Sequence, residues 1–153
     1  MSHPGKVELT AVNETIAALF DALSFEPGHQ PNISAIKNLF VEGGLLINCN
    51  EHAPQTFQVG QFIEHFQSLF KQQQITSLHE TEVHHKTKVY DHIAHRYSFY
   101  EARTAPDTAP FAVGINTIQL IKTNEGWKIT SMAWNDDHRG DGFFERTIAC
   151  INQ

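Results

Sequence analysis

The sequence has few cysteines, few charged residues and no long apolar run, and each shortage excludes a class of protein. Cys49 and Cys150 are far apart and have no C-x-x-C spacing, which excludes a disulfide framework and leaves buried thiols as the expected state of both. Nowhere do about 18 apolar residues run together, so no membrane-spanning helix is predicted. The first residues lack the apolar core of a signal peptide, and we therefore expect a cytoplasmic protein.

Basic residues and reaction motifs are also scarce. The 153 residues include 11 lysines and arginines against 17 acidic residues, a formal net charge of -6. Nucleic-acid binding needs clustered basic side chains that displace counterions, and these 11 are scattered, so we expect no nucleic-acid partner. The sequence contains no G-x-S-x-G and no glycine-rich phosphate loop. No motif therefore specifies a reaction, and no cofactor is expected.

The residues that are present describe one folded domain spanning 1–153, with a core over about 10–137 and a C-terminal tail over 138–153. Hydrophobic residues make up 41% of the chain and charged residues 18%, which is typical of a globular protein. The 11 phenylalanines favour a large apolar interior, or an interior that contains a cavity.

Three helices are predicted in the first half of the chain. Apolar residues recur at three- and four-residue steps over 10–24, 33–40 and 59–70. Pro27 lies in the loop that ends the first of these helices, and Asn32 is a candidate N-cap for the second. A short strand is predicted at 45–49.

Two long hairpins are predicted in the second half. The first covers 75–104, and a three-residue turn at 90–92 would pair Val83 with Phe99 and His79 with Arg103. That register gathers the apolar residues on one face and leaves a charged face that is expected to be solvated. This face consists of Glu80, Glu82, His84, Lys86, Lys88, Arg96, Ser98 and Tyr100. The second hairpin, 114–137, turns at 124–126 and is apolar on both faces, so we expect both faces to be covered.

This order of elements resembles a known family. Helix, short helix, strand, helix and four long antiparallel strands, with LFVEGGLLINCN after the second helix and GINTIQLIKTNEGWKITSMAWNDD as the last hairpin, resemble the nuclear transport factor 2-like superfamily and its SnoaL-like small domains. The resemblance covers residues 10–137. It implies a cystatin-like α+β cone in which a curved, mixed but mostly antiparallel sheet wraps three N-terminal helices and leaves a pocket. The superfamily includes isomerases, cyclases, dehydratases and non-catalytic domains, so the fold does not specify a function.

Two positions depart from the isomerases of this superfamily. The resemblance, aligned on Leu39-Phe40, puts their carboxylate base at Asn48 and their oxyanion-binding tyrosine near Ile16. Asparagine does not accept a proton at neutral pH and isoleucine has no donor, which argues against steroid isomerisation.

Candidate acid–base residues lie on the hairpin face expected to line the pocket. A histidine and a carboxylate on one apolar face could exchange protons, and the candidate catalytic residues are His79, His95 and Glu101. The alternative is that these polar groups meet solvent at the wide end of the cone. No metal site is expected, because His79 and His85 stand about 20 Å apart at about 3.3 Å per residue. The acids at 135–138 could belong to an acid–base dyad, but turn residues there favour a simple strand exit.

The sequence therefore predicts a domain that binds a small apolar or aromatic molecule. The expected ligand-binding residues are Phe20, Phe62, Phe66, Tyr97, Phe99, Asn116 and Trp127. An enzyme of the isomerase, cyclase or dehydratase type is the first alternative, and a non-catalytic interaction domain is the second. We expect a homodimer through the convex sheet face, formed by Ile118, Met132 and Trp134.

Overall fold

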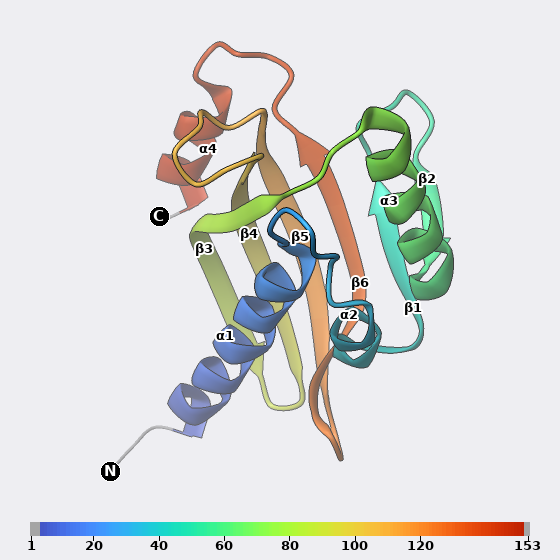
Figure 1. Cartoon of the computed structure of the whole chain (residues 1–153). Coiled ribbons are helices and arrows are strands. Elements are labelled where there is room, and N and C mark those ends of the chain that lie inside the picture. The colour runs from blue at the N-terminus through green and yellow to red at the C-terminus, as the bar shows by residue number, and fades with distance from the viewer. Residues whose placement is uncertain (1–3, 152–153) are drawn as a thin grey trace.

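The computed structural model describes residues 4–151, which form four helices and a six-stranded sheet (Figure 1). In chain order these are α1 Pro4–Leu23, α2 Ile33–Leu39, β1 Phe40–Asn48, β2 Gln55–Gln58, α3 Val59–Gln73, β3 His79–Tyr90, β4 Ile93–Arg103, β5 Ala112–Thr123, β6 Gly126–Asp136 and α4 Phe143–Ile151. The expected α+β class and the expected order of the first three helices are confirmed. Residues 152–153 of the tail lie outside the described residues.

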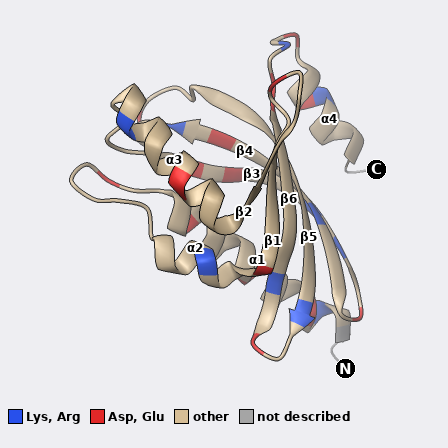
Figure 2. Ribbon diagram, turned by 90° about the vertical axis from the view of Figure 1, so that its right-hand side faces the viewer, with Lys and Arg blue, Asp and Glu red and all other residues tan. Residues whose placement is uncertain are grey.

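The strands follow the order β2-β1-β6-β5-β4-β3. Every neighbouring pair is antiparallel except β1 and β6, which are parallel. Figure 2 shows α1, α2 and α3 on one side of the curved sheet and α4 on the other. The side that faces α1, α2 and α3 is called the concave face below. Among residues 4–151, no helix combines the length and the apolar character needed to cross a bilayer.

The core lies between α1, α2 and the concave face. The apolar residues of α1 that recur at helical spacing, Val12, Ile16 and Leu19, are almost fully buried against Leu46, Ile118, Leu120 and Ile129 of the sheet. Helix α2 begins as the sequence predicts, because the Asn32 side chain accepts a hydrogen bond from the Ala35 amide at 3.1 Å.

The hairpin of β3 and β4 differs from the prediction at its turn and in its faces. The turn has two residues, Asp91 and His92, with Asp91 in the left-handed region at φ 51°. A bulge at Val83 then absorbs one residue, so that His79 pairs with Arg103, as predicted, although the outer half of the hairpin is shifted by one. The apolar residues that were expected inside are partly exposed, Val83 at 45% and Ile93 at 50%.

Part of the face expected to be solvated is buried instead, because the charges of Glu82 and Arg96 neutralise each other there, whereas Lys88 is exposed. Arg96 is only 2% exposed, and its guanidinium forms an ion pair with Glu82. Arg96 also donates to Asn13 of α1 at 2.6 Å and to Thr87 at 3.0 Å, while Ser98 donates to Glu82 at 2.5 Å. Paired and hydrogen-bonded charges can be buried where isolated charges cannot. This group, the Arg96 cluster, ties α1 to the sheet.

A second bulge decides which face of the last hairpin is inward. Ser131 pairs with Gln119 and Ile129 with Leu120, so Thr130 is the extra residue. Side-chain alternation changes phase there, and Trp127, Ile129, Met132 and Trp134 all turn toward the helices. The prediction that these residues lie on the convex face is therefore wrong: Ile118 and Met132 are buried in the core, and Trp134 packs edge-on against Phe62 of α3. The homodimer itself stays a prediction.

Candidate functional site

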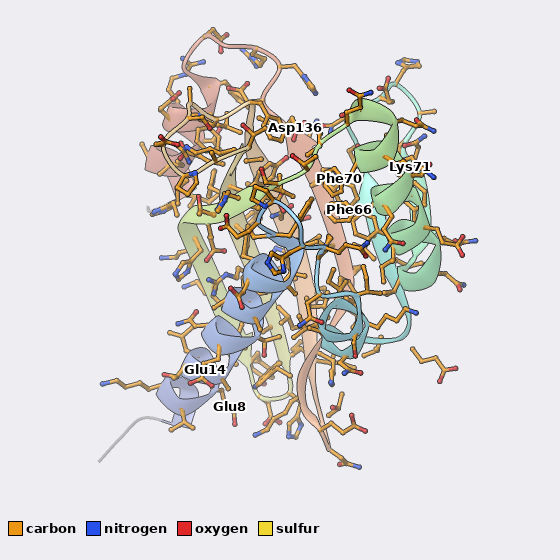
Figure 3. The ribbon with its side chains drawn as sticks, in the orientation of Figure 1. Glu8, Glu14, Phe66, Phe70, Lys71 and Asp136 are labelled. Atoms are coloured by element: carbon orange, nitrogen blue, oxygen red, sulfur yellow. The ribbon has the colours of Figure 1, made fainter. Side chains whose placement is uncertain are left out.

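A cavity of about 250 Å³ lies between α3 and the concave face, near the ends of β1 and β6. Most of its wall is apolar. Phe62, Phe66 and Phe70 of α3 form a continuous aromatic stripe, with ring centroids 5.3 Å apart in the first pair and 4.3 Å apart in the second. Figure 3 shows Phe66 and Phe70 directed from α3 toward the sheet and Lys71 directed away from it.

Helix α3 presents this stripe because its apolar residues follow helical spacing. At its start, the Gln58 amide donates to the Gln61 side chain at 3.0 Å, which satisfies one of the free amides of the first turn. At its end, Gln74 adopts a left-handed conformation at φ 56° and stops the helix. The three phenylalanines are thereby held on one rigid element facing the sheet.

The polar end of the cavity is built across three neighbouring strands. Tyr100 of β4, Gly114 of β5 and Asp136 of β6 stand directly opposite one another. The Tyr100 hydroxyl reaches over β5 and donates to Asp136. Asn50 donates to the same carboxylate at 3.2 Å, and its side-chain oxygen accepts from the Asp136 amide at 2.6 Å. The Asp136 carboxylate is therefore fixed in place by two neutral donors.

Gly114 makes this crossing possible. A Cβ atom at position 114 would overlap the Tyr100 hydroxyl and the Asn135 carbonyl oxygen, and would lie 2.7 Å from the Asp136 Cα. Only glycine permits such a close approach of a side chain to the backbone of a central strand. The glycine is therefore a structural requirement of the Tyr100–Asp136 hydrogen bond.

Glu80 of β3 is a second carboxyl group in the cavity wall. Burial, with a smaller contribution from the nearby Asp136 carboxylate, raises the pKa of Glu80 to about 7. The backbone of Glu80 is anchored by Ser24, whose hydroxyl accepts from the Glu80 amide at 3.0 Å and donates to the Phe20 carbonyl at 2.9 Å. Burial and the Asp136 carboxylate also raise the pKa of Tyr100, which keeps its hydroxyl protonated as a donor.

Four of the residues expected to bind a ligand line this cavity: Phe20, Phe62, Phe66 and Asn116. The other three do not. Trp127 is buried elsewhere in the core, where its indole nitrogen donates to Glu8 at 2.7 Å. Tyr97 and Phe99 are on the convex face, and Phe99 is covered by Phe144 of α4 at 5.7 Å between ring centroids.

The expected placement of His79, His95 and Glu101 in one pocket is wrong. None of them lines the cavity, and each has a partner elsewhere. His79 lies 3.3 Å from Glu26, His95 lies 3.3 Å from Gln119, and Glu101 is paired with Arg103 at 2.9 Å. Glu80 of β3 and Tyr100 of β4 line the cavity, so the inward parity of both strands at this end is opposite to the one predicted, and these three side chains lie on the other face.

Sequence reasoning missed Glu80, Tyr100, Gly114 and Asp136 as a group. The signal available was weak: acids at the end of the last strand are compatible with a dyad, and the structure keeps Asp136 inside β6 at the cavity. Within residues 4–151, no three histidine, cysteine, aspartate or glutamate side chains come close enough to hold a metal ion.

No protein-family model matches the sequence, and no curated protein matches it. Crystal structures with a similar fold exist at low identity. A protein of unknown function with a cystatin-like fold from Nostoc punctiforme is 12% identical and superposes with a TM-score of 0.70 over 87% of this chain and 93% of its own. An NTF2-like protein from Novosphingobium aromaticivorans is 14% identical, with a TM-score of 0.68 over 96% of this chain and 90% of its own.

A third structure, of a protein from Streptomyces avermitilis, is described as a candidate dehydratase from the NTF2-like family. It is 10% identical, with a TM-score of 0.67 over 86% of this chain and 97% of its own. These likenesses show the fold, which is the NTF2-like, cystatin-like α+β cone. At such identities they do not show an activity. The closer relation to SnoaL-like domains stays a prediction.

Proposed function

We propose that this chain binds a small, largely apolar molecule between α3 and the concave sheet and exchanges a proton with it through Glu80 and Asp136. The observation that carries the proposal is the pair of carboxyl groups at one end of a mostly apolar cavity, one of them with a pKa of about 7.

The cavity supports the binding part of the proposal. Its volume of about 250 Å³ is close to the lower end of the ~300–1,000 Å³ range of ligand pockets, which suits a molecule of one or two fused rings. Aromatic and aliphatic walls with a few polar groups at one end are typical of such pockets.

The two carboxyl groups support the proton exchange. A group whose pKa lies near the working pH is present in both protonation states, which is the best compromise for a general acid or base. Glu80 meets that condition, and Asp136 is held by Tyr100 and Asn50 as a second, oriented carboxylate. The reaction class would be an isomerisation, cyclisation or dehydration, and the Streptomyces avermitilis structure described as a candidate dehydratase is compatible with it.

A second candidate function is binding without turnover. It is favoured by the apolar character of most of the wall and by the absence of any histidine other than His65 among the described residues that line the cavity. Glu80 would then only supply a hydrogen-bond donor to a neutral ligand.

The binding part is tested with the neutral two-ring dye 1-naphthylamine, whose emission shifts to shorter wavelength in an apolar site. We expect saturable binding that the cavity-filling change Ala112→Phe abolishes. The matched control is Ile121→Phe on the convex face of the same strand, which should leave binding intact. Equal binding by both variants would place the dye elsewhere and contradict the proposal.

The proton exchange is tested with 5-nitrobenzisoxazole, a small neutral aromatic compound. Its ring opens when a base takes the C3 proton and the N–O bond breaks to give a coloured phenolate. We expect catalysis above that of free acetate, with a rate that rises through about pH 7 as Glu80 ionises, and its loss in Glu80→Gln. The exposed Glu64→Gln on α3 is the control. Dye binding without ring opening that depends on Glu80 would favour the second candidate.

A further inference from the structure

The charges that line the cavity are all of one sign. Its described lining contains the carboxyl groups of Glu80 and Asp136 but no lysine or arginine. The neighbouring arginines are engaged elsewhere, since Arg96 is bound to Glu82 and Arg103 to Glu101. Within the described part of the chain, the side-chain donors to the Asp136 carboxylate are the neutral groups of Tyr100 and Asn50, which orient it without neutralising it.

We propose that the cavity selects an organic cation, namely an aromatic or apolar molecule that carries one protonated amine, with the amine at Asp136 and the apolar body along α3. This assignment rests on the small-molecule site proposed above and specifies the class of its ligand. An anionic ligand would have to approach two carboxyl groups with no compensating cation, so carboxylates and phosphates are excluded by repulsion.

The aromatic wall adds to this preference. A cation is attracted to the face of an aromatic ring by the quadrupole of the ring, and the attraction grows when water is excluded. Phe66 and Phe70 are perpendicular neighbours, with an interplanar angle of 70°, and Phe62 is edge-on to Trp134. Ring pairs at such steep angles present ring faces in more than one direction around the cavity.

Glu80 couples this binding to protons. The titratable groups that line the cavity with it are His65 from α3, Tyr100 from β4 and Asp136 from β6, whereas α1 contributes only apolar side chains. A bound cation would favour the ionised form of Glu80 and so lower its pKa from about 7. Binding near pH 7 should therefore release a proton, and the affinity for a cation should rise as the pH rises through 7.

The test uses three compounds of nearly equal shape that differ in charge: tryptamine, tryptophol and indole-3-acetate. Titration calorimetry at physiological salt should show tryptamine binding at least tenfold more tightly than tryptophol, and indole-3-acetate binding most weakly. Calorimetry in two buffers of different ionisation enthalpy should reveal release of a proton with tryptamine, and this release should vanish in Glu80→Gln.

Two variants separate the local effect from the net charge of the protein. Asp136→Asn keeps an oxygen that accepts from Tyr100, and it should remove the preference for tryptamine over tryptophol. Glu64→Gln removes one exposed surface charge and should leave the preference unchanged.

The outcomes are distinct for the two proposals. Tryptophol binding as tightly as tryptamine, or a tryptamine preference that survives in Asp136→Asn, would overturn the cation assignment while dye binding and ring opening still support the pocket. If none of the three indoles bound while the dye still did, the cation assignment would be overturned as well. Loss of dye binding in the unmodified protein would overturn the proposed function itself.

Discussion

Glu80 and Glu82 are two residues apart on β3, point to the same face of the sheet and have opposite environments. Glu82 is paired with the Arg96 guanidinium and accepts from Ser98. Among residues 4–151 no lysine or arginine is paired with Glu80, and burial raises its pKa to about 7. Burial alone therefore does not decide the charge of a carboxyl group in this protein. The partner decides it, so one glutamate holds the fold together and its neighbour remains free to titrate.

The largest expected effect comes from removing the partner of Glu82. Arg96→Met leaves the Glu82 carboxylate without its cation. It also removes the N–H groups that donate to the side chains of Asn13 and Thr87. We expect a loss of about 3–5 kcal/mol in the free energy of unfolding, measured by urea denaturation. Arg146→Met, which removes an exposed arginine from α4, should change stability little. Equal losses in the two variants would show that the Arg96 cluster has no special role.

The next largest effect concerns Tyr100, Gly114 and Asp136, which stand opposite one another on three neighbouring strands. Gly114→Ala places a methyl group against the Tyr100 hydroxyl and the neighbouring backbone, and should cost about 1–3 kcal/mol of stability. Gly60→Ala in α3 has open space around the new methyl group and a helical position, so it should be neutral or slightly stabilising. Equal denaturation midpoints for the two variants would contradict the close packing at Gly114.

Glu80→Gln should change the dependence of stability on pH. The pKa of Glu80 is higher in the folded protein than its ordinary value of 4.5, so the folded state holds this proton more tightly than the unfolded state. Stability contributed by the protonated group is complete below about pH 4.5 and is lost as the pH rises to about 7. Relative to the unmodified protein, Glu80→Gln should gain roughly 1–3 kcal/mol at pH 8 and nothing at pH 4. Urea denaturation at both pH values checks this, and a difference that does not depend on pH would contradict the raised pKa.

The smallest effect comes from the hydroxyl that anchors Glu80. Ser24→Ala removes the acceptor of the Glu80 amide and the link between β3 and the end of α1. We expect a loss of about 1 kcal/mol by denaturation, while Ser68→Ala on the exposed side of α3 should cost less. A Ser24→Ala variant as stable as the unmodified protein would show that another group replaces the anchor.

The parts of the fold that follow regular periodicity could be predicted from the sequence. The aromatic stripe of α3 follows from helical spacing, and the N-cap at Asn32 follows from residue type. The pairing of His79 with Arg103 was predicted correctly only because the shorter turn and the bulge at Val83 offset each other. Phe20, Phe62, Phe66 and Asn116 were accordingly placed near the cavity that the structure contains.

The polar end of the site could not be predicted, because it depends on two irregularities that leave no clear trace in residue type. The bulges at Val83 and Thr130 each change the phase of side-chain alternation within a strand. A prediction that assumes strict alternation of side chains therefore assigns one half of such a strand to the wrong face of the sheet. Burial of Arg96 and Glu82 added to the error, since a charged face is expected to meet solvent unless its charges pair through space.

The bulge at Thr130 also has a consequence for tracing the ancestry of this chain. A relative that lacks the extra residue must show a one-residue deletion inside a strand, where alignment methods place gaps reluctantly. Without that gap, the residues of the relative that correspond to Trp127 and Ile129 would be aligned one position away, with residues that do not point toward the helices. A correct alignment of such a relative must therefore place its gap at position 130, inside β6.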